Sequence, residues 1–239
     1  MDTPSATPPS DSVFGWPAGW SVSVVEETGS TNADLLVAAA EGAPDRTVLM
    51  ARHQSAGRGR MDRRWEAPAG ANLLVSLLLR DVPEHPHVLT QRVGLAAIAA
   101  CEEVAGVKPS LKWPNDLLLG GAKLAGVLAQ ARLGANPAVV VGIGINVGWA
   151  PEGAARLGEG IEPAEVLAAM LRAYDALPAD IWLPYRKHLD TLGRQVRVEL
   201  SDGEVTGRAL DVEPDGRLIV VDECGITHRF AVGDIIHLR

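Results

Sequence analysis

Hydrophobic positions recur along this chain with two different periods. Runs with the alternating or continuous apolar pattern of strands are interspersed with stretches of helical periodicity. The strand-like runs are 22–26, 47–52, 73–79, 111–113, 116–119, 123–131 and 138–145. The helical stretches are 32–41, 91–104, 163–176 and 179–191, with Ser30 or Thr31 as N-cap of the first and Thr90 as N-cap of the second. This order predicts an α+β domain with a mixed β-sheet.

The pattern changes after Gly193. Five short alternating runs follow, at 196–200, 207–212, 218–221, 227–231 and 235–238. Turn dipeptides separate some of them, namely Asp202-Gly203, Asp215-Gly216 and Gly233-Asp234. Regular spacing with such turns is typical of a small β-barrel of about 45 residues. The expected organisation is a flexible tail at 1–12, a larger domain at 13–192 and a small β-barrel domain at 193–239.

Composition narrows the class of protein. Hydrophobic residues make up 47% of the 239 residues, which suffices for a packed core. The first residues are rich in Pro, Ser and Thr without an apolar run, and no apolar segment is long enough to span a bilayer. We therefore expect a soluble, cytoplasmic protein without a membrane partner.

The net charge and the positions of the cysteines argue against nucleic-acid-binding, disulfide-rich and metal-binding proteins. The formal net charge is −8, which argues against a general nucleic-acid binder. Cys101 and Cys224 lie far apart and outside any metal-ligand spacing, so neither a disulfide framework nor a metal site is expected.

A cluster of arginines interrupts this acidic background in the segment after the second predicted strand. Gly57-Arg58-Gly59-Arg60 is followed closely by Arg63 and Arg64. Glycines let the backbone approach a ligand, and guanidinium groups bind phosphate or carboxylate oxygens. By itself this string is more typical of a solvated basic loop, or of an RGG-like nucleic-acid contact, than of a ligand-binding site.

Two further segments carry candidate chemistry. Lys112-Trp113-Pro114-Asn115-Asp116 lies between two predicted strands, and Lys123 begins the next one. On a regular strand Lys123, Ala125, Val127 and Ala129 share a face, which predicts a pocket for a flat apolar ligand with an anionic end. An edge lysine beside a core face is the alternative.

The third segment is Gly142-Ile143-Gly144-Ile145-Asn146. Strand glycines allow close approach of a backbone or a ligand, and Asn146 can hydrogen-bond an adenine edge. The spacing matches neither the dinucleotide-binding nor the P-loop motif, so any ATP site here is of another type.

Together these segments resemble the biotin protein ligase family. The matching strings occur in that family's order over roughly 26–147: Ser30-Thr31-Asn32, Gln54 with Gly57-Arg58-Gly59-Arg60, Arg63 and Trp65, Gly70-Ala71-Asn72-Leu73, Lys112-Trp113-Pro114-Asn115-Asp116, Lys123-Leu124-Ala125-Gly126 and Gly144-Ile145-Asn146. The terminal β-barrel is similar to that family's SH3-like C-terminal domain. The short N-terminal tail leaves no room for a DNA-binding winged helix, so the chain resembles the catalytic-only type.

The resemblance implies roles for these residues. Biotin would contact Ser30, Thr31, Asn32, Gln54, Arg58, Gly59, Arg60 and Lys123. ATP would contact Arg58, Arg60, Arg63, Trp65 and Asn146. The implied catalytic residues are Arg60, Lys123, Asp116 and Lys112. One departure from the family pattern is Asp62, which stands where the family often has glycine and bears on loop closure and adenylate retention.

The implied reaction has two steps. Biotin and ATP, the latter carrying Mg²⁺, form biotinyl-5'-AMP, and the biotinyl group then passes to a lysine of a biotin carboxyl carrier domain. Asp116 is the candidate to orient or deprotonate that lysine, or else it pairs with Lys112 or Lys123. A lipoate ligase or octanoyl transferase and a non-enzymatic binding module are the competing interpretations, and the sequence leaves open whether the protein is a monomer or a homodimer.

Overall fold

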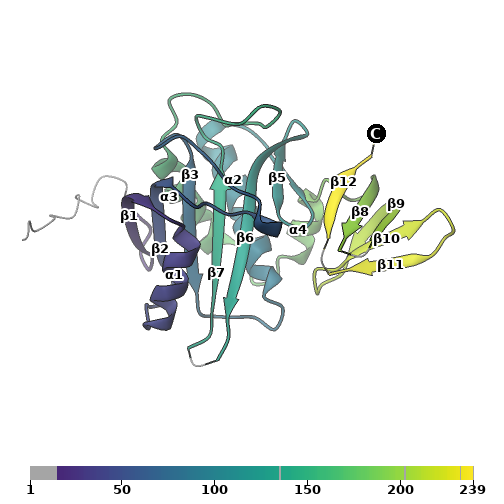
Figure 1. Cartoon of the computed structure of the whole chain (residues 1–239), viewed down its shortest axis with the longest axis horizontal. Helices are drawn as coiled ribbons and strands as arrows, with labels where there is room; N and C mark the ends of the chain where they lie inside the picture. The colour runs from purple at the N-terminus through teal and green to yellow at the C-terminus, as the bar shows by residue number, and fades with distance from the viewer. Residues whose placement is uncertain (1–14, 135, 202, 232, 239) are drawn as a thin grey trace, which may run out of the picture.

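The structure, a computed structural model, describes residues 15–134, 136–201, 203–231 and 233–238, apart from the side chain of Asp62. The expected tail at 1–12 lies outside the described residues. The chain forms one large and one small β-sheet, and the small sheet stands beside the end of the large sheet that carries β5 (Figure 1).

The large sheet is mixed. Its strands are β1 (Ser21–Thr28), β2 (Thr47–Gln54), β3 (Leu73–Leu79), β4 (Ser110–Lys112), β5 (Asp116–Leu119), β6 (Ala122–Arg132) and β7 (Ala138–Ile145). They lie in the order β1-β2-β3-β7-β6-β5-β4. Only the pair β1 and β2 is parallel, because a helix connects these strands and returns the chain to the same end of the sheet.

Helices cover the two faces of this sheet unequally. They are α1 (Thr31–Ala40), α2 (His87–Ala105), α3 (Pro163–Ala176) and α4 (Trp182–His188). The main core lies between α2, α3 and the alternate residues of β3 and β7, such as Val75 and Val141. On the opposite face α1 packs Leu35 and Ala39 against Leu78. Since α1 is short, it leaves part of that face for other segments to cover.

The small sheet is antiparallel and formed by the last part of the chain. Its strands are β8 (Gln195–Leu200), β9 (Gly203–Val212), β10 (Leu218–Asp222), β11 (Thr227–Phe230) and β12 (Asp234–His237), in the order β11-β10-β9-β8-β12. The expected fold class, an α+β domain with a mixed sheet followed by a small C-terminal all-β unit, is confirmed. The domain division expected at 192/193 stays a prediction.

The boundaries of two helices were wrongly predicted. Helix α2 begins at His87, before Thr90, because Pro86 occupies the N-cap position with a helical backbone conformation. Helix α4 is shorter than the predicted 179–191. The Asp180 carboxylate accepts a hydrogen bond from the backbone N–H of Trp182, and Leu189 leaves the helix to bridge Leu111 of β4.

No helix in the described part of the chain is long and apolar enough to cross a membrane.

Candidate active site

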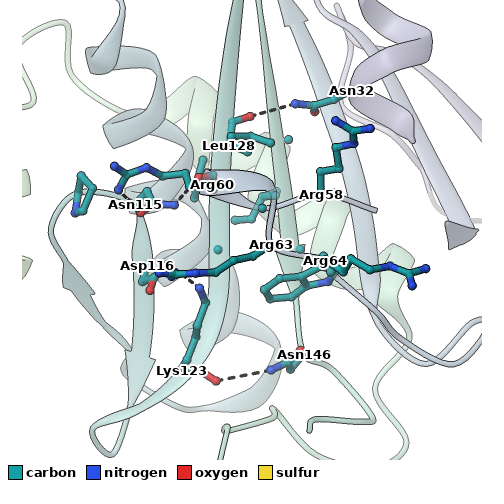
Figure 2. Close-up of a pocket in the computed structure, with 18 of the residues that line it drawn as sticks. Asn32, Arg58, Arg60, Arg63, Arg64, Asn115, Asp116, Lys123, Leu128 and Asn146 are labelled. Carbon is teal, nitrogen blue, oxygen red and sulfur yellow. Dashed lines mark hydrogen bonds and ion pairs between the residues drawn. The ribbon is translucent and has the colours of Figure 1, made fainter. Parts of the chain in front are cut away.

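A cavity of about 460 Å³ opens on the face of the large sheet that α1 leaves uncovered. Its floor is formed by β6 and β7, and the start of α1 closes one side. The segment 58–66 lies over it, as Figure 2 shows. The small sheet closes the far side with Glu199, Asp234, Ile235 and Ile236. Segments from the whole length of the chain therefore meet at one site.

Glycines make the floor deep enough for other groups to approach. A Cβ at Gly142 would lie 2.2 Å from Asn32 Oδ1, and one at Gly144 would lie 2.4 Å from the indole of Trp65. The sequence predicted close approach of a backbone or a ligand at these strand glycines. The approaching groups are side chains of α1 and of the loop after β2, which only the fold could identify.

A chain of hydrogen bonds closes the end of the cavity near α1. The Gln54 Oε1 atom accepts from both the backbone N–H and the hydroxyl of Thr31, at 2.8 and 3.0 Å. The Thr31 hydroxyl lies 2.7 Å from that of Ser76, which donates to Asn32 Oδ1 at 2.6 Å. Ser30 is the N-cap of α1, but its side chain makes no capping hydrogen bond. These groups form a preorganised polar wall of the kind that recognises a small polar ring.

Asn32 is also fixed from its other side. Its amide nitrogen donates to the Leu128 carbonyl at 3.1 Å and to Gln130 Oε1 at 2.9 Å, and Figure 2 shows the first of these bonds. Asn32 therefore has a defined orientation before any ligand binds.

The arginine-rich segment folds back on itself as a hairpin-like loop. The backbone N–H of Trp65 donates to the Gly57 carbonyl, Arg58 bridges Arg64, and the N–H of Gly59 donates to the Arg63 carbonyl at 2.7 Å. A Cβ at Gly57 would lie 2.4 Å from the backbone oxygen of Trp65, so glycine is required for this closure. The side chain of Asp62 lies outside the described part of the loop, and its effect stays a prediction.

The tip of this loop contacts the small sheet. Arg60 donates to the Gly233 carbonyl at 3.2 and 3.3 Å and to Asn115 Oδ1 at 3.2 Å. Asp234 forms ion pairs with Arg60 and Arg63. The sequence pattern of Gly233-Asp234 was interpreted only as a turn, and no local signal could have placed it at the cavity.

Lys123 lies opposite the loop. Its Nζ is 2.8 Å from Asp116 Oδ1 and 5.7 Å from the centre of the Trp65 ring (Figure 2). Lys112 of the neighbouring strand also lines the cavity, and burial lowers its pKa, with Lys123 and Arg63 adding to the effect. Of the partners that the sequence allowed for Asp116, the structure selects Lys123.

The predicted face of β6 was wrong. The register of β6 against β5 shifts between Leu117 and Leu118, so the strand bulges after Lys123. Consequently the Lys123 amine lies 3.4 Å from where a Gly126 Cβ would be, whereas Ala125 and Val127 point into the core. From β6 the cavity is lined by Lys123, Gly126, Val127 and Leu128, and not by Ala125 or Ala129.

Asn146 is buried and its amide is already engaged. Its side-chain nitrogen donates to the Ala155 carbonyl at 3.0 Å, and its oxygen accepts from Asn72 at 3.2 Å. The backbone N–H groups of Leu157 and Gly158 donate to the carbonyls of Asn146 and Val147. In this structure Asn146 therefore holds the segment 148–158 beside the cavity.

The structure brings together all of the predicted site residues. The cavity is lined by Ser30, Thr31, Asn32, Gln54, Arg58, Gly59, Arg60, Arg63, Trp65, Lys112, Asp116, Lys123 and Asn146. Sequence reasoning missed Ser76, although it is the single polar residue in the otherwise apolar strand β3 and so left a signal. Among the described residues no group of three or more His, Cys, Asp or Glu side chains is arranged to hold a metal ion.

Comparisons with known proteins agree with this site. Residues 25–146 match the biotin/lipoate A/B protein ligase family, and residues 191–238 match the biotin protein ligase C terminal domain. The biotin–[acetyl-CoA-carboxylase] ligase of Mycobacterium tuberculosis is 40% identical, and the alignment covers 96% of this chain and 94% of that one. The bifunctional ligase/repressor BirA of Bacillus subtilis is 32% identical, over 77% of this chain and 64% of its own length.

Solved structures of biotin protein ligases are also similar to this chain. The biotin protein ligase of Aquifex aeolicus in complex with biotin and ATP superimposes with a TM-score of 0.77 and 27% identity, over 92% of this chain and 99% of that one. The family match spans the segments that carry the polar wall, the arginine loop, Lys123 and Asn146. This chain belongs to the biotin/lipoate A/B protein ligase family and carries the C-terminal domain of the biotin protein ligases.

Proposed function

We propose that this protein activates biotin with ATP to biotinyl-5'-AMP and transfers the biotinyl group to a lysine of a biotin carboxyl carrier domain. The observation that carries the proposal is the distribution of polar and charged groups around this cavity. A neutral hydrogen-bonding wall of Thr31, Gln54 and Ser76 stands near α1, and Arg60, Arg63 and Lys123 stand at the opposite side. This arrangement suits a ligand with a polar neutral head and an anionic end.

In the first step the biotin carboxylate attacks the α-phosphorus of ATP, and pyrophosphate leaves. The substrate oxygen is itself the nucleophile, so the protein has to hold two anions together and stabilise the charge that spreads in the transition state. Lys123 faces the carboxylate and α-phosphate, and the loop arginines Arg58, Arg60 and Arg63 surround the phosphates. Mg²⁺ bound to the substrate ATP would neutralise part of the phosphate charge.

Substrate phosphates would compete with protein groups for the loop arginines. Arg60 and Arg63 are paired with Asp234 in this structure. A phosphate oxygen can replace this carboxylate with a comparable charge-assisted hydrogen bond. Trp65 beside Gly144 and the segment held by Asn146 form the surfaces on which we place the adenosine.

In the second step the amine of a carrier lysine attacks the mixed anhydride, and AMP leaves. That amine must be neutral to react. Asp116 is the carboxylate we assign to orient or deprotonate it. Its ion pair with Lys123, the residue we assign to the biotin carboxylate, supports this role. Lys112, with its lowered pKa, completes the cationic side of the cavity.

The acceptor we propose is the carrier domain of a biotin-dependent carboxylase, in keeping with the named acetyl-CoA-carboxylase ligase relative. The net charge of −8 supports a protein partner rather than nucleic acid. A cytoplasmic location, and a monomer or homodimer as the assembly, stay predictions.

Pyrophosphate–ATP exchange with the purified protein tests the first step. Biotin, lipoate and octanoate are compared as the acid, and we expect exchange only with biotin. Exchange with lipoate or octanoate instead would favour the lipoate ligase interpretation. Absence of exchange with every acid, in protein shown to be folded by circular dichroism, would contradict adenylation.

Asp116→Asn separates the two steps. If Asp116 acts on the carrier lysine, the variant retains biotin-dependent exchange but loses single-turnover transfer to the carrier domain. Equal losses in both steps would instead assign Asp116 to holding Lys123. The dependence of the single-turnover transfer rate on pH is compared between Asp116→Asn and the wild type. This dependence changes if Asp116 acts as the base, and it keeps its shape if Asp116 only positions other groups.

A further inference from the structure

The segment Lys112 to Asp116 carries two of the proposed catalytic side chains, yet its own strands are short. Trp113, which is 3% exposed, is its anchor. The indole Nε1 donates to the carbonyl of Gly216 at 2.9 Å, in the turn between β9 and β10 of the small sheet. The backbone N–H of Trp113 donates to the hydroxyl of Thr191 at 3.0 Å. The anchor therefore depends on a turn 103 residues away.

That turn has a shape only glycine permits. Gly216 has φ +84, and a Cβ there would lie 2.4 to 2.9 Å from the ring of His87 at the start of α2. The His87 Nε2 atom is buried without a hydrogen-bond partner among the described residues. The Gly216 backbone is thus enclosed between two rings of the larger domain, which fixes the direction of its carbonyl.

We propose that the β9–β10 turn is a positioning element for the reaction, and that Gly216 acts through Trp113. Pro114 joins the anchored Trp113 to Asn115 and Asp116 with little rotational freedom. Asn115 donates to the Val127 carbonyl at 2.8 Å and accepts from Arg60, while Asp116 pairs with Lys123. Fixing the indole of Trp113 therefore also fixes the positions of Arg60 and Lys123.

This role rests on the proposed function but is separable from it. A loss of positioning lowers the rate of the chemical step more than the affinity for either substrate, since small displacements of catalytic groups are costly. It also loosens 114–119 and 58–65 whether or not the protein is a ligase.

Trp182 offers a matched control. Its indole Nε1 donates to the carbonyl of Val212 at 3.2 Å, so it too ties the larger domain to β9. Trp182 is not among the described residues that line the cavity. The variants Trp113→Phe and Trp182→Phe each remove one indole-to-carbonyl hydrogen bond at the same junction.

The experiment measures biotin-dependent pyrophosphate exchange and hydrogen–deuterium exchange on the full-length wild type and both variants. We expect Trp113→Phe to lower kcat about tenfold with smaller changes in KM, and Trp182→Phe to stay within about twofold. Amide exchange in 114–119 should accelerate only in Trp113→Phe. Thermal unfolding midpoints of both variants establish that each is folded.

Equal kcat losses in the two variants, or unchanged amide exchange in Trp113→Phe, would overturn the positioning role. Gly216→Ala provides a second variant that leaves the indole in place. It should reproduce the effect of Trp113→Phe, because the added Cβ must displace His87 and turn the carbonyl. If the wild type itself shows no biotin-dependent exchange, the proposed function fails, and the amide-exchange comparison still decides the positioning role.

Discussion

Strand β7 has two faces that serve different purposes. Val139, Val141, Ile143 and Ile145 point toward α2 and α3 and form part of the main core. On the other face Ala138 and Val140 pack under α1, and the series continues as Gly142 and Gly144 beneath the cavity. On this face, β7 therefore changes from a packing surface to the floor of the site between Val140 and Gly142, where glycines replace residues with side chains.

The comparison teaches how a single sheet supports stability and chemistry at once. Large side chains on the core face contribute burial, which scales with apolar area. Glycines on the cavity face contribute nothing to burial but admit Asn32 and the Trp65 indole within contact distance of the backbone. Substitutions on the cavity face should therefore change activity, and those on the core face should change stability.

The largest effect is expected at Lys123. Lys123→Ala removes the cation opposite the loop and should lower kcat/KM for adenylation by about 10²- to 10³-fold. The free energy of unfolding should change by about 1 kcal/mol or less, because the ion pair is partly exposed. Lys108→Ala, at an exposed lysine that pairs with Glu102, is the control and should retain full activity. Near-wild-type turnover of Lys123→Ala would remove Lys123 from the site.

Adjacent residues on β7 give the sharpest test of the two faces. In Gly144→Ala the new methyl group must displace the Trp65 indole, and activity should fall about 10²-fold with little change in thermal unfolding. Ile145→Ala leaves a core cavity and should cost about 2–5 kcal/mol of unfolding free energy, while the folded fraction stays active. Chemical denaturation measures the stability of both variants, and pyrophosphate exchange measures their activity. A large loss of stability in Gly144→Ala, or of activity in folded Ile145→Ala, would contradict the separation of the two faces.

A smaller effect is expected on β3, where Ser76 and Leu78 share a face. Ser76→Ala deprives Thr31 and Asn32 of a hydrogen-bond partner and should raise KM for biotin about tenfold. Leu78 packs under α1, so Leu78→Ala should lower the free energy of unfolding by about 2–5 kcal/mol without changing the KM for biotin. Steady-state kinetics at several biotin concentrations measure the difference, and equal KM values would mean that the hydroxyl has no part in the polar wall.

The smallest effect is a pH dependence at the junction of the two sheets. Burial lowers the pKa of both His87 and His237 below the ordinary value of 6.5. Nearby titratable groups modify this: His85 lowers and Asp215 raises the pKa of His87, while Lys112 and Arg194 lower and Asp190 raises that of His237.

The sign of the effect follows from proton binding. Below pH 6.5 the unfolded chain binds protons that the folded histidines do not, so stability is full above 6.5 and falls as the pH drops toward the folded pKa values. Thermal unfolding followed from about pH 8 to about pH 5 measures this decline. His87→Leu should make it shallower. An unchanged slope in that variant would assign the decline to other groups.

Local sequence was sufficient for most of the secondary structure. The limits of β3, β5, β7 and α3 coincide with the predicted ones, because Gly, Pro, Asn or charged residues bound the apolar runs there. The errors at Thr90 and after His188 arose where Pro86 and the contact of Leu189 with Leu111 set the boundary. The misassigned face of β6 has the same origin, since a bulge depends on the register with the neighbouring strand.

The sequence by itself determined the residue types that could bind anions and the glycines that could admit a ligand. Spacing along the chain and resemblance placed the arginine loop, Lys123 and Asn146 in one family pattern. Tertiary structure alone decided that Ser76 joins the polar wall, that Asp116 pairs with Lys123, and that Asp234 and Gly216 of the small sheet reach the catalytic segments. The physical reason is that these contacts join residues far apart in the chain, and their partners are set by sheet register and domain packing rather than by any local propensity.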